Sequence, residues 1–117
     1  MRVLVTGSRV WNNRELIRKE LQKLPAGTTI LHGAAKGADS LAAQISKDLG
    51  FVVIAFPAEW HRFGKAAGVI RNTRMLEEGL PDLVLAFTPS LESSPGTLDM
   101  VTKARKAGVR VIVFEDQ

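Results

Sequence analysis

Residues 1–11, with the sequence MRVLVTGSRVW, decide the fold and the position of the expected site. Val3, Leu4 and Val5 form a short apolar run, and a run of this length followed by turn residues predicts a buried strand. Gly7 makes the turn, and a helical pattern follows it. A strand, a glycine turn and a helix N-terminus bring backbone N–H groups and the positive end of a helix dipole together. This combination favours the binding of an anion.

The composition is that of an ordinary globular protein. The 117 residues are 45% hydrophobic and 24% charged, which suits one domain spanning residues 1–117. The chain has no cysteine, and its two histidines, His32 and His61, are far apart in the sequence. We therefore expect no disulfide, no metal site and no cofactor. No apolar stretch approaches the roughly 20 residues that span a membrane, so we expect a cytoplasmic protein, in the host cytoplasm if a phage encodes it.

Short apolar runs alternate with helical patterns along the whole chain. Strands are expected at residues 2–6, 29–32, 51–56, 83–87 and 110–114, and helices at residues 12–24, 38–49, 66–78 and 97–107. Continuous apolar strands that alternate with helices predict an α/β fold with a parallel sheet covered on both faces. Right-handed crossovers favour a doubly wound, Rossmann-like sheet in the order 3-2-1-4-5, flanked by helices.

Three local details follow from the same patterns. The strand at residues 51–56 is apolar throughout, so we expect it inside the sheet with both faces covered. In the third of the four helices, Val69, Thr73 and Leu76 have the spacing of a face that points to the core. Residues 57–65 are expected to form a loop.

In a doubly wound sheet, ligands bind beyond the carboxyl ends of the strands. The first loop there lacks the G-x-G-x-x-G fingerprint of dinucleotide-binding proteins and the G-x-x-x-x-G-K-[ST] motif of P-loop proteins. An NAD-dependent dehydrogenase and a P-loop nucleotidase are therefore disfavoured. Gly7, Ser8 and Arg9 suit either an anion or only a tight turn. Trp11 either faces the ligand or braces the turn that presents Arg9.

The loop after the second strand, HGAAKGAD at residues 32–39, carries more information. Gly33 and Gly37, with small residues between them, allow backbone N–H groups to approach a ligand closely. Lys36 reaches an anion. Asp39, in the first turn of the next helix, either contacts a ligand hydroxyl or only stabilises the helix dipole. His32 is expected to be structural.

The third loop and the helix after it supply further polar candidates. Trp60 either stacks on a planar base or covers the edge of the core. Glu59 is an acid–base candidate by residue type only. Arg71 has no evident partner in the sequence, whereas Arg74 and Glu78 have the i,i+4 spacing of an ion pair.

Residues 94–97, SPGT, open the last helix and predict a second N-terminal anion site at Gly96 and Thr97. Two such sites on either side of the switch point of the sheet suit a phosphorylated or pyrophosphate-bearing ligand. The net charge of +4 adds a mild attraction for anions. Residues 61–74 contain basic residues and no acid, which indicates either a solvated helix face or an anion-facing patch. These basic residues are Arg62, Lys65, Arg71 and Arg74.

Five motifs occur in a fixed order: V-T-G-S-R-x-W, H-G-x-A-x-G-A-D, P-A-x-W, A-G-x-x-R-N and P-G-T. With them the chain resembles, over nearly its full length, the YspA/YpsA-related branch of the SLOG superfamily. This Rossmann-like group includes DprA and the LOG phosphoribohydrolases. The resemblance implies a pocket for a nucleotide or a nucleotide-derived ligand. By position, the pocket residues are Gly7, Ser8, Arg9, Gly33, Gly37, Asp39, Arg71, Asn72, Gly96 and Thr97.

The resemblance leaves catalysis open. The enzymatic LOG proteins carry P-G-G-x-G-T-x-x-E, whose glutamate acts with an arginine to cleave an N-glycosidic bond. Met100 takes the place of that glutamate, and Asp99 lies one residue earlier, about 100° around the helix. Asp99, Asp39 and Glu59 are the candidates for a replacement carboxylate.

These observations favour a module that binds a nucleotide or a nucleotide derivative and acts as a ligand sensor. The first alternative is a phosphoribohydrolase that cleaves the N-glycosidic bond of nucleoside 5′-monophosphates. The second is single-stranded nucleic acid binding, by analogy with DprA and from the basic run at residues 61–74. The expected partners are a nucleotide-type small molecule and a second copy of the chain, with nucleic acid less favoured and no membrane.

Overall fold

The computed structural model describes residues 1–115, so residues 116–117 of the expected domain lie outside the described part. Its centre is a five-stranded sheet in the order β3-β2-β1-β4-β5. Every neighbouring pair of strands is parallel. The predicted Rossmann-like α/β arrangement is therefore confirmed.

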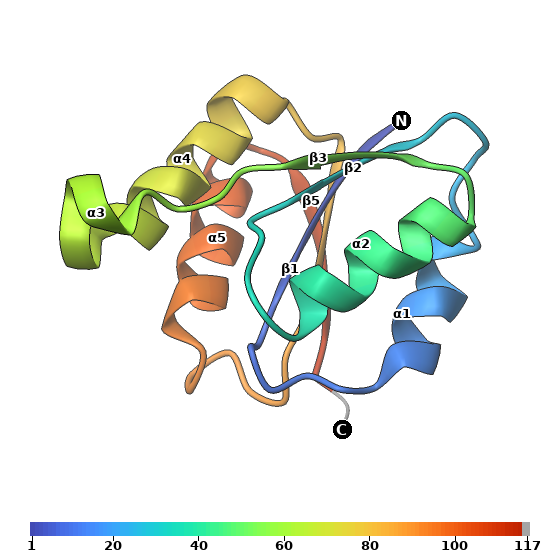
Figure 1. Ribbon diagram of the computed structural model, residues 1–117, viewed down its shortest axis with the longest axis horizontal. Coiled ribbons are helices and arrows are strands. Elements are labelled where there is room, and N and C mark those ends of the chain that lie inside the picture. The colour runs from blue at the N-terminus through green and yellow to red at the C-terminus, as the bar shows by residue number, and fades with distance from the viewer. Residues whose placement is uncertain (116–117) are drawn as a thin grey trace.

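The strands and helices alternate as the sequence indicated (Figure 1). The strands are β1 (Arg2–Gly7), β2 (Thr29–His32), β3 (Val52–Ala55), β4 (Leu83–Phe87) and β5 (Arg110–Phe114). The helices of eight residues or more are α1 (Arg14–Leu21), α2 (Ala38–Asp48), α4 (Ala67–Gly79) and α5 (Pro95–Lys106). Between β3 and α4 lie two short helical turns, α3 (Trp60–Phe63) and η1 (Gly64–Ala66).

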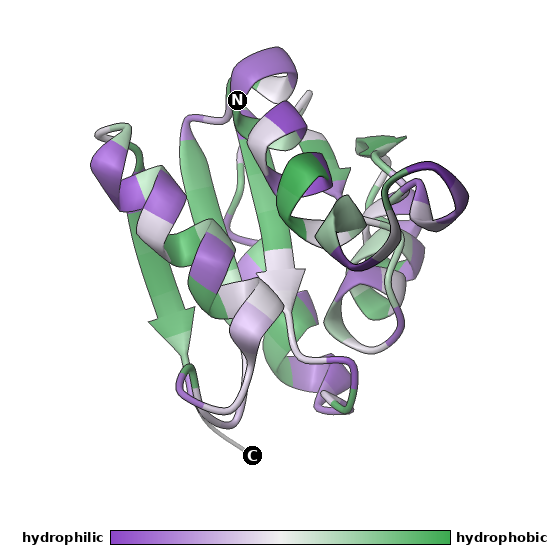
Figure 2. Ribbon diagram, turned by 90° about the vertical axis from the view of Figure 1, so that its left-hand side faces the viewer, coloured by the Kyte–Doolittle hydropathy of each residue, from purple (hydrophilic) through white to green (hydrophobic). Residues whose placement is uncertain are grey.

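The sheet separates two apolar layers. On one face, Val3 and Val5 of β1 pack in a cluster with residues of α1 and α2 such as Ile17 and Ile45. On the other face, Leu4 packs in a cluster with residues of α4 and α5. Successive strand residues point to opposite faces, so the apolar run of β1 serves both layers. Figure 1 shows α1 and α2 on one side of the sheet and α4 and α5 on the other. Figure 2, seen from the side of α4 and α5, shows that the strands behind these helices are hydrophobic.

Strand β3 differs from the prediction. It lies at the edge of the sheet, paired only with β2, and its side chains are largely exposed. Val52 is 59% exposed and Ile54 37%. An edge strand of a parallel sheet has the same apolar composition as an inner one, but no helix covers its outer margin. The expectation that this strand is covered on both faces is therefore wrong.

Two further local predictions need correction. The buried residues of α4 include Asn72 and Met75, whereas Val69 is 48% exposed. The inward face of this helix is thus rotated from the expected one, because a polar side chain, Asn72, points inward. The expected loop at residues 57–65 contains α3 and most of η1, which bury none of their residues. No helix in the described residues is long and apolar enough to cross a membrane.

Candidate functional site

A cavity of about 1180 Å³ lies at the carboxyl ends of the strands. Loops that follow β1, β2, β3 and β4 line it, together with the first turns of α2 and α5 and one side of α4. In Figure 1 the loops after β1, β2 and β4 gather at the lower end of the sheet. The predicted ligand-binding residues that line it are Gly7, Ser8, Arg9, Gly33, Lys36, Asp39, Trp60, Arg71, Asn72, Gly96 and Thr97.

Trp11 and Gly37 do not line the cavity. Trp11 is only 3% exposed: its ring lies 5.8 Å from the ring of Phe87, and its Nε1 donates to the carbonyl of Asn13. It therefore braces the turn after β1, which corrects its placement among the ligand-facing residues. Gly37 has a φ of +74°, and a Cβ there would lie 2.6 Å from the carbonyl oxygen of Arg9. Its role is to let the first two loops touch.

Three side chains hold the loop at residues 33–35 from different directions. Asp39 Oδ2 accepts hydrogen bonds from the N–H groups of Gly33, at 3.0 Å, and Ala35, at 3.2 Å. His32 Nδ1 accepts from Ala34 N–H at 3.0 Å. Arg71 donates through Nη1 to the carbonyl of Gly33. This rigid loop holds Ala34 at a φ of +59°, a conformation that costs energy for a residue with a Cβ.

The ionisation of these groups follows from their burial. Burial raises the pKa of Asp39 to about 6, although the N–H groups of Ala35 and Gly33 and the charge of Arg71 oppose this rise. Burial also lowers the pKa of His32, and the charges of Lys47 and Arg71 lower it further. A neutral His32 is what its bond requires, because Nδ1 must be unprotonated to accept the N–H of Ala34.

The predicted role of the loop at residues 33–37 is changed by these bonds. The N–H groups of Gly33, Ala34 and Ala35 all donate within the protein, and that of Ala38 donates to the Ser8 carbonyl. Asp39 thus accepts with its own carboxylate two of the N–H groups that the sequence assigned to a ligand, those of Gly33 and Ala35.

At the N-terminus of α5, the first N–H groups also stay available. Pro95 has no N–H, and within the described residues the N–H groups of Gly96 and Thr97 donate to no protein acceptor. A Cβ built on Gly96 would meet no atom within 4 Å. The protein's own packing therefore gives no reason for a glycine in this helical turn, where alanine is the better helix former.

Two of the three candidate catalytic carboxylates lie outside the cavity lining. Asp99 accepts from Nδ2 of Asn72 at 3.0 Å and pairs with Lys103 at 3.0 Å. Glu59 lines a smaller neighbouring hollow instead. Asp39 alone of the three lines the main cavity. Met100, in the place of the LOG glutamate, is fully buried in the core.

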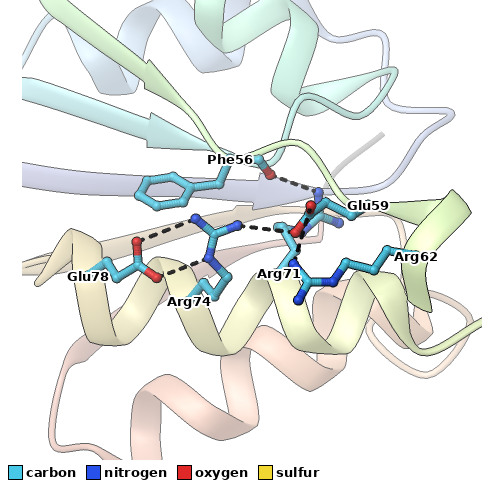
Figure 3. A network of polar contacts seen from close by, with 6 residues as sticks. All are labelled: Phe56, Glu59, Arg62, Arg71, Arg74 and Glu78. Carbon is cyan, nitrogen blue, oxygen red and sulfur yellow. Dashed lines mark hydrogen bonds and ion pairs between the residues drawn. The ribbon is translucent and has the colours of Figure 1, made fainter. Parts of the chain in front are cut away.

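The basic residues of 61–74 do not form one patch (Figure 3). Arg74 pairs with Glu78 at 3.0 Å, as its spacing predicted, and with Glu59 at 3.8 Å. Arg62 lies 4.0 Å from the same Glu59 carboxylate. Arg71 instead turns to the loop after β2 and to the carbonyl of Phe56 at 3.5 Å. Arg62 and Arg74 are therefore in surface ion pairs, Arg71 lies in the cavity wall, and Lys65 is exposed and takes part in neither within the described residues.

The structure adds cavity residues that the sequence analysis did not select. Thr6, the next-to-last residue of β1, lines the cavity, and Ser93 and Ser94 line it from the loop before α5. Ser94 occupies the cap position of α5, which the residue pattern S-P-G-T signals once the helix is known to begin at Pro95 rather than at Thr97. None of the described residues forms a group of three or more histidine, cysteine or acidic side chains that could hold a metal ion.

Comparison with known proteins agrees with this architecture. The family described as YspA, cpYpsA-related SLOG matches residues 1–63. The chain belongs to this family. A relative called Gene 61 protein, from Mycobacterium phage D29, is 41% identical over 125 residues, covering 99% of this chain and 98% of that protein.

One solved structure shares the fold of this SLOG protein over its full length. It is DNA processing protein A (DprA) from Streptococcus pneumoniae, with a TM-score of 0.82 and 21% identity. The match covers 99% of this chain but only 50% of the DprA chain. The likeness therefore extends to the Rossmann-like fold of one half of DprA.

Proposed function

We propose that the cavity binds a nucleotide or a nucleotide-derived ligand, with its phosphate groups at the N-terminus of α5. Two unused N–H groups carry the proposal: those of Gly96 and Thr97, two residues that line the cavity. The protein's own packing gives no reason for a glycine at position 96. An anion at this point gains the hydrogen bonds and the favourable end of the helix dipole.

The charges of the cavity support the same ligand class. Arg9 and Lys36 are exposed side chains at its wall, and no ion pair within the described residues engages either of them. The exposed Trp60 adds an aromatic face, on which a nucleobase can stack. The cavity is large for a mononucleotide, since small-molecule sites usually measure about 300–1,000 Å³. It has room for a nucleoside diphosphate or an ADP-ribose-like compound.

Binding is preferred over hydrolysis because the carboxylates are not arranged for catalysis. Asp99 is held by Asn72 and Lys103, and Glu59 is held by arginines outside the cavity. Membership of the family and the phage relative are compatible with a ligand sensor that works inside a bacterial host cell. The hydrolase remains the alternative, with Asp39 as its remaining candidate.

Isothermal titration calorimetry with AMP, ADP, ADP-ribose and cyclic dinucleotides tests the proposal. We expect binding that weakens about tenfold in Lys36→Glu, because a charge reversal replaces attraction by repulsion in the cavity wall. Lys19→Glu, on the exposed surface of α1, is the matched control and should bind as the wild type does. No binding by any of these compounds, or equal losses in both variants, contradicts the proposal.

A further inference from the structure

The carboxylate of Asp39 is used on one side only. Asp39 is only 5% exposed, and its Oδ2 accepts hydrogen bonds from the N–H groups of Gly33 and Ala35. Oδ1 accepts no hydrogen bond from the described residues. It is not fully buried, in contrast to Ser46 Oγ, which is both buried and without a partner in the described residues. Since Asp39 lines the cavity, Oδ1 opens to it as a free acceptor.

A phosphate group is a poor partner for this oxygen. Two anions at hydrogen-bond distance repel each other, and the N–H groups of Gly33 and Ala35, which could have offset the repulsion, already donate to Asp39. The group that faces Oδ1 must therefore be a hydrogen-bond donor. In a nucleotide, the donors nearest the phosphates are the hydroxyls of the sugar.

The surroundings of Asp39 place it at the right part of the ligand. A Cβ on Gly68 would lie 3.7 Å from the Trp60 ring and 3.9 Å from Nη2 of Arg71. Arg71 in turn donates to Gly33, whose N–H Asp39 holds. Trp60, Arg71 and Asp39 thus follow one another along the cavity wall. In the proposed mode of binding, the base stacks on Trp60 and the phosphates bind at α5, and we infer that the sugar lies beside Arg71 and Asp39 of the same cavity wall.

We propose that Oδ1 of Asp39 accepts a hydrogen bond from a ribose hydroxyl, so that the cavity selects ligands with an intact ribose. This inference rests on the proposed nucleotide binding. Asp39 then has two roles: one carboxylate oxygen accepts hydrogen bonds from the loop, and the other binds the sugar hydroxyl. A charged acceptor makes the contact stronger than a neutral one.

Calorimetry with ADP and 2′,3′-dideoxy-ADP on the wild-type protein tests the contact without any variant. We expect dideoxy-ADP to bind about tenfold more weakly, as suits the loss of one hydrogen bond to a charged group. No binding of ADP overturns the nucleotide proposal together with this one. Equal affinity for the two compounds overturns the ribose contact alone.

The variant Asp39→Asn assigns the preference to this residue. Its amide oxygen still accepts from Gly33 and Ala35, but the atom that faces the cavity becomes an N–H donor. The amide N–H offers the hydroxyl oxygen only a neutral hydrogen bond, so we expect ADP binding to weaken, dideoxy-ADP binding to stay within about twofold of the wild type, and the preference for ADP to shrink. Asp48→Asn, at the exposed far end of the same helix, is the matched control and should keep the preference. An unchanged preference in Asp39→Asn contradicts the assignment.

Discussion

The guanidinium group of Arg71 lies directly on the backbone of Gly33, so that a Cβ at position 33 would stand 2.7 Å from Arg71 Cζ. Arg71 also donates to the carbonyl of Gly33 from this position. A side chain at position 33 would therefore have to displace the guanidinium group of Arg71, which comes from α4, 38 residues further along the chain. This contact joins the two halves of the cavity wall. The glycines of the site are of two kinds, because an added Cβ would meet protein atoms at some of them and open space at others.

The first kind lies in close contact with other atoms of the protein. In Gly33→Ala, the added methyl group must displace Arg71 or the loop, and we expect a loss of about 1–3 kcal/mol in the free energy of unfolding, as for other overpacked sites. Urea denaturation measures this loss. Stability equal to the wild type would show that Arg71 moves away freely, and the clamp on the loop would then be weaker than its geometry indicates.

The second kind leaves open space. Gly96→Ala adds a methyl group that meets no protein atom, in a helical turn where alanine is preferred. We expect the free energy of unfolding to stay unchanged or to rise by up to about 1 kcal/mol. We expect ADP to bind more weakly, because the methyl group stands where the phosphate approaches. Denaturation and calorimetry on the same sample check both results, and unaltered ADP affinity would argue against a phosphate at α5.

The sequence predicts the sheet well because its signals are local and redundant. Val3, Leu4 and Val5 need only their apolar run to be recognised as a buried strand, and the helical spacing after each loop fixes the alternation. The carboxyl-end rule then gathers the loops into one site. This is why Arg9, Lys36 and most of the other predicted residues do lie along a single cavity.

The remaining errors arise where tertiary contacts decide. Nothing local distinguishes Val52 in an edge strand from a valine in an inner strand. Trp11 has an aromatic side chain on which a ligand could stack, but it packs against Phe87, a residue 76 positions away in the sequence. The hydrogen bonds from Gly33 and Ala35 to Asp39 depend on the rotamer of Asp39, which no sequence motif indicates. The sequence therefore could not show that these two N–H groups are already used.

The buried carboxylate of Asp39 predicts a pH-dependent stability. Its pKa is raised from 3.8 to about 6 in the folded protein, so the folded state holds the proton more tightly than the unfolded state does. Asp39 therefore destabilises the protein above pH 6, and this cost disappears as the pH falls towards 4. His32 acts in the opposite direction, because its lowered pKa makes acid destabilising.

The difference between wild type and Asp39→Asn isolates this residue. We expect the variant to be more stable at pH 8 by up to about 3 kcal/mol, since each unit of pKa shift corresponds to about 1.36 kcal/mol. The gap should narrow between pH 6 and 4. Urea midpoints across this range measure it. A constant gap at every pH would mean that Asp39 titrates in the folded protein as it does in the unfolded chain.

Ser46 offers a stabilising substitution away from the cavity. Its hydroxyl is buried in α2, and Oγ has no hydrogen-bond partner within the described residues. Ser46→Ala removes an unpaired polar group and adds a better helix former, so we expect a gain of about 1–2 kcal/mol in the free energy of unfolding. Ser40→Ala, which removes a hydroxyl that donates to the Ala35 carbonyl at 3.0 Å, is the contrasting control and should not stabilise the protein by this amount.

Met100 explains why the LOG glutamate cannot be restored by a single substitution. Position 100 is fully buried in a cluster with Leu4, Met75 and Val84, so Met100→Glu places a carboxylate among apolar side chains without a partner. We expect destabilisation by more than about 4 kcal/mol, or a strongly raised glutamate pKa that makes stability increase on acidification. Leu98→Glu, at a 40% exposed position of the same helix, is the matched control and should unfold near the wild-type midpoint. Thermal unfolding followed by circular dichroism distinguishes the two variants. If Met100→Glu is as stable as Leu98→Glu and releases free base from AMP, the side chain at position 100 must reach the cavity. Hydrolysis would then be favoured over binding alone as the function of this protein.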